Sequence, residues 1–216
     1  MTGDAGARLE ELVVANAGVL LIRRKLLSDA FDDYRWRRDP ELARYDGNPP
    51  IELTYSEFFE RFRRELEFPT GDRRSFSIVL PDGRHIGNIM YYNADLAHTS
   101  AELGISIALP EFQGVGLGAV AMITFVRYLW HRHAFRRLYL HTLDWNERAR
   151  RCFRTAGFDQ TARVSRKGQS FVRMETRREW WLLWDQEGRF EPPVRRAQAR
   201  LRELGIECPA LPAHST

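Results

Sequence analysis

The chain has 216 residues, of which 44% are hydrophobic and 29% charged, a composition that is ordinary for a globular protein with one main domain. A formal net charge of +4 is a mild excess without the concentrated basic stripe of a dedicated nucleic-acid binder, so we do not expect a nucleic-acid partner. The two cysteines are isolated and no targeting segment or membrane span is visible, which favours a cytoplasmic protein without a disulfide framework or a zinc site.

The N-terminal half is predicted to supply helices and the first strands of a sheet. Apolar residues recur at helical spacing after Thr54, and Ser28 is a suitable N-cap for an earlier helix. Two β-rich runs flank the turn sequence Pro81-Asp82-Gly83, which predicts an antiparallel hairpin. The expected elements are a tail with a short helix over 1–17, a strand over 19–26, helices over 28–38 and 54–66, a turn-rich connector over 38–50, and hairpin strands over 75–80 and 84–92.

The C-terminal half begins with a strand over 101–108 whose two faces differ, because side chains alternate across a strand. Leu103, Ile105 and Ile107 share an apolar face, and the other face carries Glu102 followed by small residues. The remaining expected elements are an amphipathic helix over 119–133, a strand over 137–143, a helix over 146–156 with Gly157 as its C-cap, hairpin strands over 161–166 and 170–176, and a basic helix after a break at Pro192-Pro193.

These elements predict a mixed α/β sheet with helices on its faces. We expect a tail or short helix over residues 1–18, one domain over 19–184, and a C-terminal basic helix and tail over 185–216. No internal repeat is visible.

Three glycines, Gly114, Gly116 and Gly118, stand immediately before the long amphipathic helix. The N–H groups at a helix N-terminus lack partners and carry the positive end of the helix dipole, so a bare backbone there suits a phosphate group. A flexible loop is the alternative. A dinucleotide fingerprint also fits the letters, but the strand does not lead directly into the glycines, and Arg136 and Arg137 stand where an acidic residue is wanted. A nucleoside-triphosphate loop is excluded because no Gly-Lys-Ser or Gly-Lys-Thr follows.

The loop resembles the pyrophosphate loop of the GNAT superfamily of N-acetyltransferases, Gln/Arg-x-x-Gly-x-Gly/Ala, at Gln113, Gly116 and Gly118. The resemblance continues through the strand AELGISIA, the run LYLHTLDWNERARRCFRTAGF and a closing hairpin, and it extends from the first strand to Trp181. Within the superfamily, the chain looks most like the branch of ribosomal-protein N-terminal and spermidine acetyltransferases, in which Ser-Ala-Glu begins the central strand and Asn begins the later helix.

The resemblance implies a GNAT-type α/β (α+β) fold, with a splayed central sheet of about seven strands, flanking helices and an extra C-terminal helix. It also implies acetyl-CoA as cosubstrate and no metal, with the pyrophosphate on the loop backbone and the pantetheine arm along the central strand. Asn146 would reach the cofactor, although an ordinary helix-cap role is an equal alternative. The residues expected to bind the cofactor are Ile105, Ser106, Ile107, Gln113, Gly114, Val115, Gly116, Leu117, Gly118, Ala119, Asn146 and Phe153.

Acetyl transfer needs an uncharged amine, and Glu102 is our candidate base because it precedes the cofactor-facing residues on the same strand face. Structural pairing with a neighbouring arginine is the alternative role. In the resembling family a tyrosine normally protonates the departing thiolate, but Phe153 stands at that position and leaves the role vacant. His141 could donate instead, whereas Cys152 is expected to be packed in the core.

The first helices and their connector mix aromatic and acidic groups that suit a cationic amine. Packing roles are the alternative for such aromatic side chains. We expect the acceptor pocket to be lined by Tyr34, Trp36, Tyr45 and Asp46.

Three functions remain open from the sequence. The first is an N-acetyltransferase whose acceptor is a protein N-terminus, a polyamine or another small amine. The second is a GNAT-like protein that binds acyl-CoA without efficient transfer, a reading motivated by Phe153. The third is a ribosome- or RNA-binding module that uses the arginines and the C-terminal helix. A homodimer could form through the aromatic cluster of Trp180, Trp181 and Trp184, or that cluster could cover a sheet edge.

Overall fold

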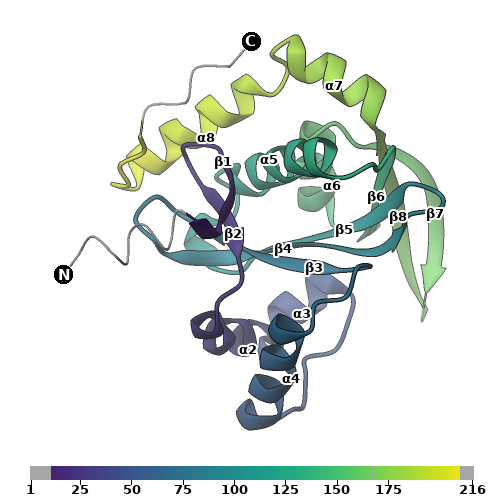
Figure 1. Cartoon of the computed structure of the whole chain (residues 1–216). Helices are drawn as coiled ribbons and strands as arrows, with labels where there is room; N and C mark the ends of the chain where they lie inside the picture. Colours follow the sequence, from purple (N-terminus) through teal and green to yellow (C-terminus); the bar gives the residue numbers. More distant parts are fainter. Residues whose placement is uncertain (1–10, 167, 210–216) are drawn as a thin grey trace.

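The computed structural model describes residues 11–166 and 168–209, which form one mixed sheet with helices against both faces (Figure 1). Within these residues, eight strands follow the order β1-β2-β3-β4-β5-β6-β8-β7, and each neighbouring pair is antiparallel except β5 with β6. The strands are β1 (Val13–Asn16), β2 (Leu21–Arg24), β3 (Arg74–Val79), β4 (His85–Asp95), β5 (Ser100–Ile107), β6 (Arg137–Leu143), β7 (Asp159–Arg166) and β8 (Gln169–Arg177).

Helices α2, α3 and α4 lie on the opposite side of the sheet from α5, α6, α7 and α8 (Figure 1). The helices are α2 (Ala30–Arg38), α3 (Pro40–Asp46), α4 (Tyr55–Glu67), α5 (Leu117–Arg132), α6 (Glu147–Thr155), α7 (Arg178–Gln186) and α8 (Glu191–Glu203), with short 3-10 helices η1 (Leu27–Asp29) and η2 (Pro110–Phe112). In the described part of the chain, no helix has the length and apolar character that a membrane crossing requires.

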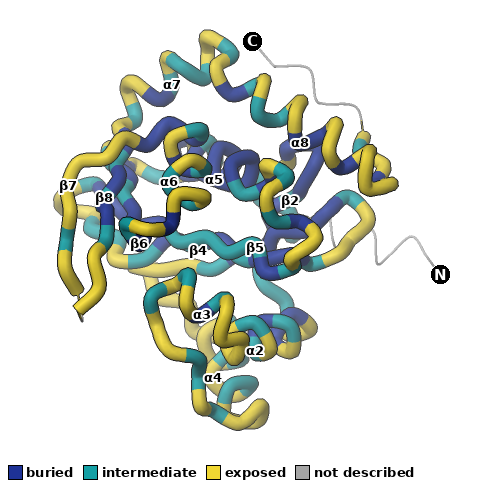
Figure 2. The backbone as a smooth tube through the Cα atoms, turned by 180° about the vertical axis from the view of Figure 1, so that it is seen from behind, coloured by how far each residue is buried: buried dark blue, intermediate teal, exposed yellow. Residues whose placement is uncertain are grey.

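Helix α5 lies at the centre of the core. Its apolar side chains recur every three or four residues, and Phe125 and Trp130 are completely buried. Figure 2 shows that this helix is buried along most of its length, between the sheet and the arm formed by α7 and α8. Each large apolar side chain stabilises the fold by about 1.5–3 kcal/mol when it is fully buried. The buried side chains of α5 therefore hold the helix against the sheet, with its N-terminus beside β5.

Strands β5 and β6 begin side by side and then separate. Their parallel register ends at the pair Glu102 and Tyr139. Beyond that pair, β5 continues to Ile107 with β4 as its partner, and β6 continues to Leu143 with β8 as its partner. The sheet therefore has a V-shaped opening whose edges carry backbone groups that need partners. This is the splayed arrangement that the resemblance implied.

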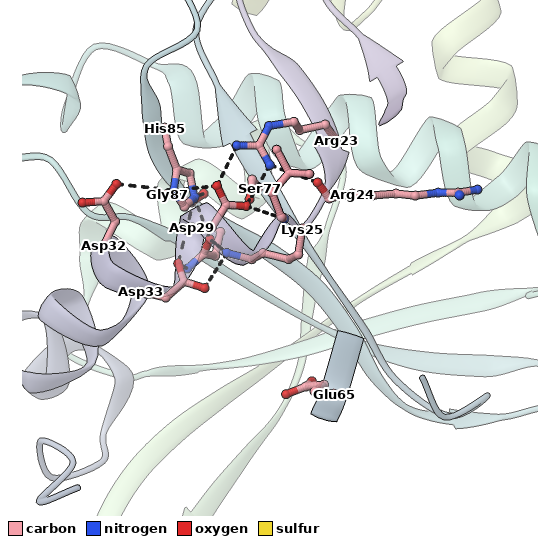
Figure 3. A network of polar contacts seen from close by, with 12 residues as sticks. Arg23, Arg24, Lys25, Asp29, Asp32, Asp33, Glu65, Ser77, His85 and Gly87 are labelled. Carbon is pink, nitrogen blue, oxygen red and sulfur yellow. Dashed lines mark hydrogen bonds and ion pairs between the residues drawn. The ribbon is translucent and has the colours of Figure 1, made fainter. Parts of the chain in front are cut away.

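A buried network of charged groups fixes α2 to the sheet (Figure 3). The carboxylate of Asp29 accepts two hydrogen bonds of 2.7 Å from the Arg23 guanidinium and one of 2.7 Å from Ser77 Oγ. Lys25 Nζ donates to Asp33 at 2.5 Å. Burial alone would raise the pKa of Asp29, but the hydrogen bonds that it accepts outweigh burial and lower the pKa to about 2.

Elements with a strong periodic or turn signal are confirmed. The two hairpins form β3 with β4 and β7 with β8. The amphipathic segment forms α5, and the predicted strand over 137–143 is β6. The helix predicted from Thr54 is α4, for which Thr54 is the N-cap and exchanges hydrogen bonds with Glu57 in a capping box.

Two predictions near the N-terminus are wrong. The strand β1 occupies Val13–Asn16, within the span where a tail and short helix were expected, because these residues pair with β2. Glu11 and Leu12, directly before the strand, are helical, which agrees with the expected short helix. The rest of that expectation falls on residues 1–10 and lies outside the described residues. Ser28 is not the N-cap of α2, because the residue before the helix is Asp29, whose carboxylate accepts from the N–H of Leu26.

The predicted connector over 38–50 contains α3. Asp39 caps this helix by accepting from the N–H of Glu41 at 2.8 Å, Pro40 occupies its first turn, and Gly47 ends it at a left-handed φ of 67°. Pro192-Pro193 likewise does not break a helix but stands in the first turn of α8, where proline is well tolerated. The sequence analysis also assigned no helix to the residues of α7.

Candidate functional site

The glycine-rich loop presents a row of free N–H groups at the N-terminus of α5. Gly114 and Gly116 have φ angles of 79° and 98°, in the left-handed region that favours glycine. Before the loop, the N–H of Gln113 donates to Pro110, and after it the N–H of Ala119 donates to Gly116. Among the described residues, the N–H groups of 114–118 donate to no protein acceptor. Such a row beside a helix N-terminus suits an anion.

Side chains of α6 and α8 lie against one side of the loop, and the side at Gly114 is open. A Cβ atom built on Gly118 would lie 3.3 Å from Cys152 Sγ, and one built on Gly116 would lie 3.7 Å from the Cβ of Ala197 in α8. At Gly114, in contrast, no heavy atom lies within 4 Å of that position. A ligand could therefore approach the backbone at Gly114 without displacing a side chain.

The other predicted loop residues turn their side chains into the protein. Leu117 is completely buried and Ala119 nearly so, while Val115 is partly buried against the core. Their contribution to a ligand would come through main-chain atoms.

Gln113 links the loop to the opening in the sheet. Its Nε2 donates to the carbonyl oxygen of Ile107 at 2.9 Å, and its Oε1 accepts from Arg148 of α6 at 2.7 Å. Ile105 and Ile107 pack partly against the core, and Ser106 is half-buried on the opposite face of β5. All three lie on the part of β5 that has separated from β6.

Glu102 is buried at the point where the two strands separate. Its Oε1 accepts from Tyr92 Oη at 3.1 Å and from His141 Nδ1 at 2.6 Å, and its Oε2 accepts from Asn93 Nδ2 at 3.0 Å. Because a carboxylate only accepts, His141 carries its hydrogen on Nδ1 and a lone pair on Nε2. Burial, together with the neighbouring carboxylate, raises the pKa of Tyr92 and keeps it a neutral donor.

The structure thus joins Glu102 and His141, which the sequence suggested for separate roles. Among the described residues, Glu102 has no arginine partner, so the alternative of an arginine pairing is wrong. The partner of Glu102 is the imidazole of His141 and not an arginine.

Helix α6 and its N-cap carry three residues that the sequence singled out, Asn146, Cys152 and Phe153, and Cys152 lies against Gly118 of the loop. Asn146 is buried and caps the helix by accepting from the N–H of Ala149 at 3.1 Å, which confirms its cap role. Phe153 is buried and packs against Phe158. Burial raises the pKa of the Cys152 thiol to about 12. Neither Phe153 nor Cys152 therefore offers an acidic proton at neutral pH.

The predicted acceptor residues do not gather in one pocket. Each aromatic side chain has a different neighbour, and Asp46 is exposed at the end of α3. The contacts are from Tyr34 Oη to the Leu53 carbonyl at 3.1 Å, from Trp36 to the His85 ring at 4.6 Å between centroids, and from Tyr45 to the Trp145 ring at 5.6 Å between centroids.

A cavity of about 740 Å³ opens instead between α3, the start of α6 and the β7–β8 hairpin. The Arg44 guanidinium lies 5.0 Å from the centre of the Trp145 ring at this cavity. Neither Arg44 nor Trp145 was among the predicted site residues, although Trp145 directly precedes the predicted helix cap. The cavity is lined by Ala43, Arg44, Gly47, Asn48, Pro49, Trp145 and Gln169. Among the described residues, no three potential metal ligands gather at one point.

Comparison with known protein families assigns the chain to a family. The model of the acetyltransferase (GNAT) domain matches residues 20–159. A search of curated protein sequences found no match.

Two solved structures have a similar fold. Spermidine N-acetyltransferase from Vibrio cholerae, in complex with CoA and spermine, has 21% sequence identity and a TM-score of 0.68, and the match covers 76% of this chain and 98% of that one. An aminoglycoside acetyltransferase in complex with coenzyme A has 18% identity and a TM-score of 0.62, with 74% and 95% covered.

Proposed function

Because the chain belongs to the GNAT acetyltransferase family, we propose that it transfers the acetyl group of acetyl-CoA to a primary amine. The observation that carries this proposal is the row of unpaired N–H groups over 114–118 beside the opening between β5 and β6. Family membership makes the chain an acyltransferase. The nature of the acceptor and the roles of individual residues belong to the proposal.

The loop and the opening fit the two ends of acetyl-CoA. The N–H groups over 114–118, with the dipole of α5 behind them, would hold the pyrophosphate. The backbone of Ile105, Ser106 and Ile107 would pair with the amide groups of the pantetheine arm, because this edge of β5 has no strand partner on the β6 side. The thioester would then lie near Glu102, where the two strands meet.

The Glu102 and His141 pair would remove the proton that blocks attack. An ammonium group with a pKa near 10.4 costs about 4.6 kcal/mol to deprotonate at pH 7, and a protein α-amine with a pKa near 8 costs about 1.4 kcal/mol. The amine would give its proton to Nε2 of His141, and Glu102 would stabilise the resulting imidazolium through the 2.6 Å hydrogen bond to Nδ1. The amine nitrogen would form a bond to the thioester carbon, the carbon–sulfur bond would break with its electron pair on the thiolate, and the new amide nitrogen would lose its second proton to water.

The thiolate would leave without a tyrosine acid. Phe153 has no proton to give, and the raised pKa of Cys152 makes it a poor acid. A free thiol has a pKa near 8.5, so release of an unprotonated thiolate costs about 2 kcal/mol at pH 7, which slows the reaction without preventing it.

A thiol-release assay tests the proposal. Acetyl-CoA is supplied with a panel of amino acids, peptides, amino sugars and polyamines, and calorimetry measures CoA binding in parallel. We expect CoA binding and thiol release that depends on an added amine, with one acetyl group found on the amine by mass spectrometry. Binding without release over the whole panel would favour an acyl-CoA-binding protein, and absence of both would overturn the assignment.

A further inference from the structure

The sheet face that carries Glu102 also carries several arginines, and the strand register shows which ones. Directly opposed residues on neighbouring strands share a face. His141 opposes Arg173 across β6 and β8, and Arg166 opposes Gln169 across β8 and β7. Since Gln169 and Arg173 are an even number of positions apart on β8, all four side chains lie on one face. Gly47 of α3 lies against the Gln169 side chain, so this face looks toward α3 and the cavity.

Two arginines at this face have no ion-pair partner among the described residues. The Arg166 Nη2 lies 3.3 Å from Nε2 of His141, where it can donate to the lone pair that the proposed reaction needs. Arg44 contacts the Trp145 ring and is the single charged residue among the described cavity lining. Arg166 faces the base and Arg44 faces the cavity. Because neither guanidinium has a carboxylate partner, both are well placed to bind an anion.

Four carboxylates near this face already have partners. Glu102 accepts three hydrogen bonds, and Glu175 pairs with Arg173 at 2.7 Å. At the end of η1 and in α2, the carboxylates of Asp29 and Asp33 are held by cations in the network of Figure 3. Their contacts are Asp29 with Arg23 and Asp33 with Lys25.

Four acidic residues remain toward solvent on the α2–α3 side, Asp32, Asp39, Glu41 and Asp46. None of them lines the cavity, where Arg44 is the charged residue of the described lining. A polycationic acceptor would therefore meet unpaired arginines at the base and in the cavity.

We propose that the acceptor carries an anionic group, a carboxylate or a phosphate, near its amine, and that Arg166 and Arg44 bind this group. The proposal rests on the acetyltransferase function and specifies its substrate class. In the free protein Arg166 occupies the lone pair of His141 Nε2. When the anion draws the guanidinium away, Nε2 becomes free to accept the proton of the ammonium group.

The test uses pairs of amines that differ in the anionic group alone. Suitable pairs are β-alanine with β-alaninamide, glutamate with glutamine amide, and glucosamine 6-phosphate with glucosamine, and spermidine represents the polycations. We expect the best acceptor to be anionic, with kcat/KM at least tenfold above that of its neutral partner. The carboxylate and phosphate pairs show which anion is preferred. A neutral or polycationic best acceptor would overturn the proposal, whereas no turnover with any amine would count against the transferase function itself.

The variant Arg166→Gln supplies the second arm. Arg166 is exposed on the edge strand β7, so its replacement leaves the core intact. We expect KM for the anionic acceptor to rise at least tenfold, while kcat/KM for the neutral partner stays the same or rises, because the guanidinium no longer occupies Nε2 of His141. Arg163→Gln is the matched control, because Arg163 is exposed on the same strand but points to the opposite face. Equal losses for both members of a pair in Arg166→Gln would show a merely structural role and sink the proposal.

Discussion

The variant Glu102→Gln removes the negative charge beside His141 while keeping the shape of the side chain. The glutamine Oε1 can still accept from Tyr92 and His141, as the glutamate Oε1 does. Its Nε2 would then face the Nδ2 donor of Asn93, which now lies 3.0 Å from a carboxylate oxygen. Two donors would meet at a partly buried contact, and the imidazolium would lose its negatively charged partner.

The expected magnitudes follow from these contacts. One unsatisfied buried donor costs about 1–3 kcal/mol of folding free energy. In Glu102→Gln the base His141 remains but loses the carboxylate that stabilises its imidazolium, so the variant should lose much of the roughly 10²–10⁴-fold that general-base catalysis contributes to kcat. Each tenfold corresponds to about 1.4 kcal/mol in the barrier. We therefore expect Glu102→Gln to remain folded, with a lower melting temperature and kcat reduced at least 100-fold.

The assay is thiol release at saturating acetyl-CoA, with melting temperature measured on the same samples. Asn93→Gly is the matched control, because it removes the same hydrogen bond to Glu102 while leaving the carboxylate and imidazole in place. Asn93 has a φ of 50°, which glycine adopts without strain. We expect this control to lose about 1 kcal/mol of stability and less than tenfold in kcat. Equal kcat losses in the two variants, or full kcat in Glu102→Gln at every pH, would refute the base assignment.

Two further predictions follow from titratable groups outside that pair. The pKa of Asp29 is about 2 in the folded protein against an ordinary 3.8, so its ionisation stabilises the fold above pH 4 by about 2 kcal/mol and this contribution is lost as the pH falls toward 2. Denaturant unfolding between pH 5 and 2 should show this loss, and Asp29→Asn should be less stable at pH 5 and lack this part of the acid dependence; an unchanged acid dependence would contradict the reasoning. Burial raises the pKa of both thiols, that of Cys152 to about 12, so alkylation of the native protein at pH 8 should be slow at both and slowest at Cys152, as mass spectrometry can show. Faster labelling of Cys152 than of Cys208 would contradict the raised pKa of Cys152.

Local signals were sufficient for the elements that repeat a pattern over many residues. The apolar stripe from Ala119 to His133 predicted α5, and Pro81-Asp82-Gly83 predicted the first hairpin. The strand β1 has four residues and forms because β2 lies beside it, so its own sequence carries little information. Helix α3 could have been predicted, since Asp39 and Pro40 are a start signal and Gly47 is a stop signal, but the same residues also suggest turns.

The candidate site also has a part that the sequence predicted and parts that it did not. The loop could be predicted because its function lies in the backbone, and the glycines that free the backbone are visible in the sequence. The contact of Glu102 with His141 could not, because it depends on β5 and β6 being parallel neighbours in one register. The acceptor residues were chosen by residue type, whereas the cavity is formed by segments distant in sequence, such as Arg44 and Gln169.

Binding of coenzyme A to the loop is the central claim, and calorimetry on one pair of variants tests it most directly. Gly114→Asp puts a carboxylate at the open front of the loop, and Gly205→Asp adds the same charge at a glycine with a similar φ of 73° and no heavy atom within 4 Å of its Cβ position. Gly205 lies beyond the C-terminal end of α8, eight residues after Ala197, the α8 residue next to Gly116.

We predict that coenzyme A binds the parent protein and Gly205→Asp with equal affinity and binds Gly114→Asp at least tenfold more weakly. Equal affinity for all three proteins, or no heat of binding with the parent, would contradict a diphosphate site at these N–H groups.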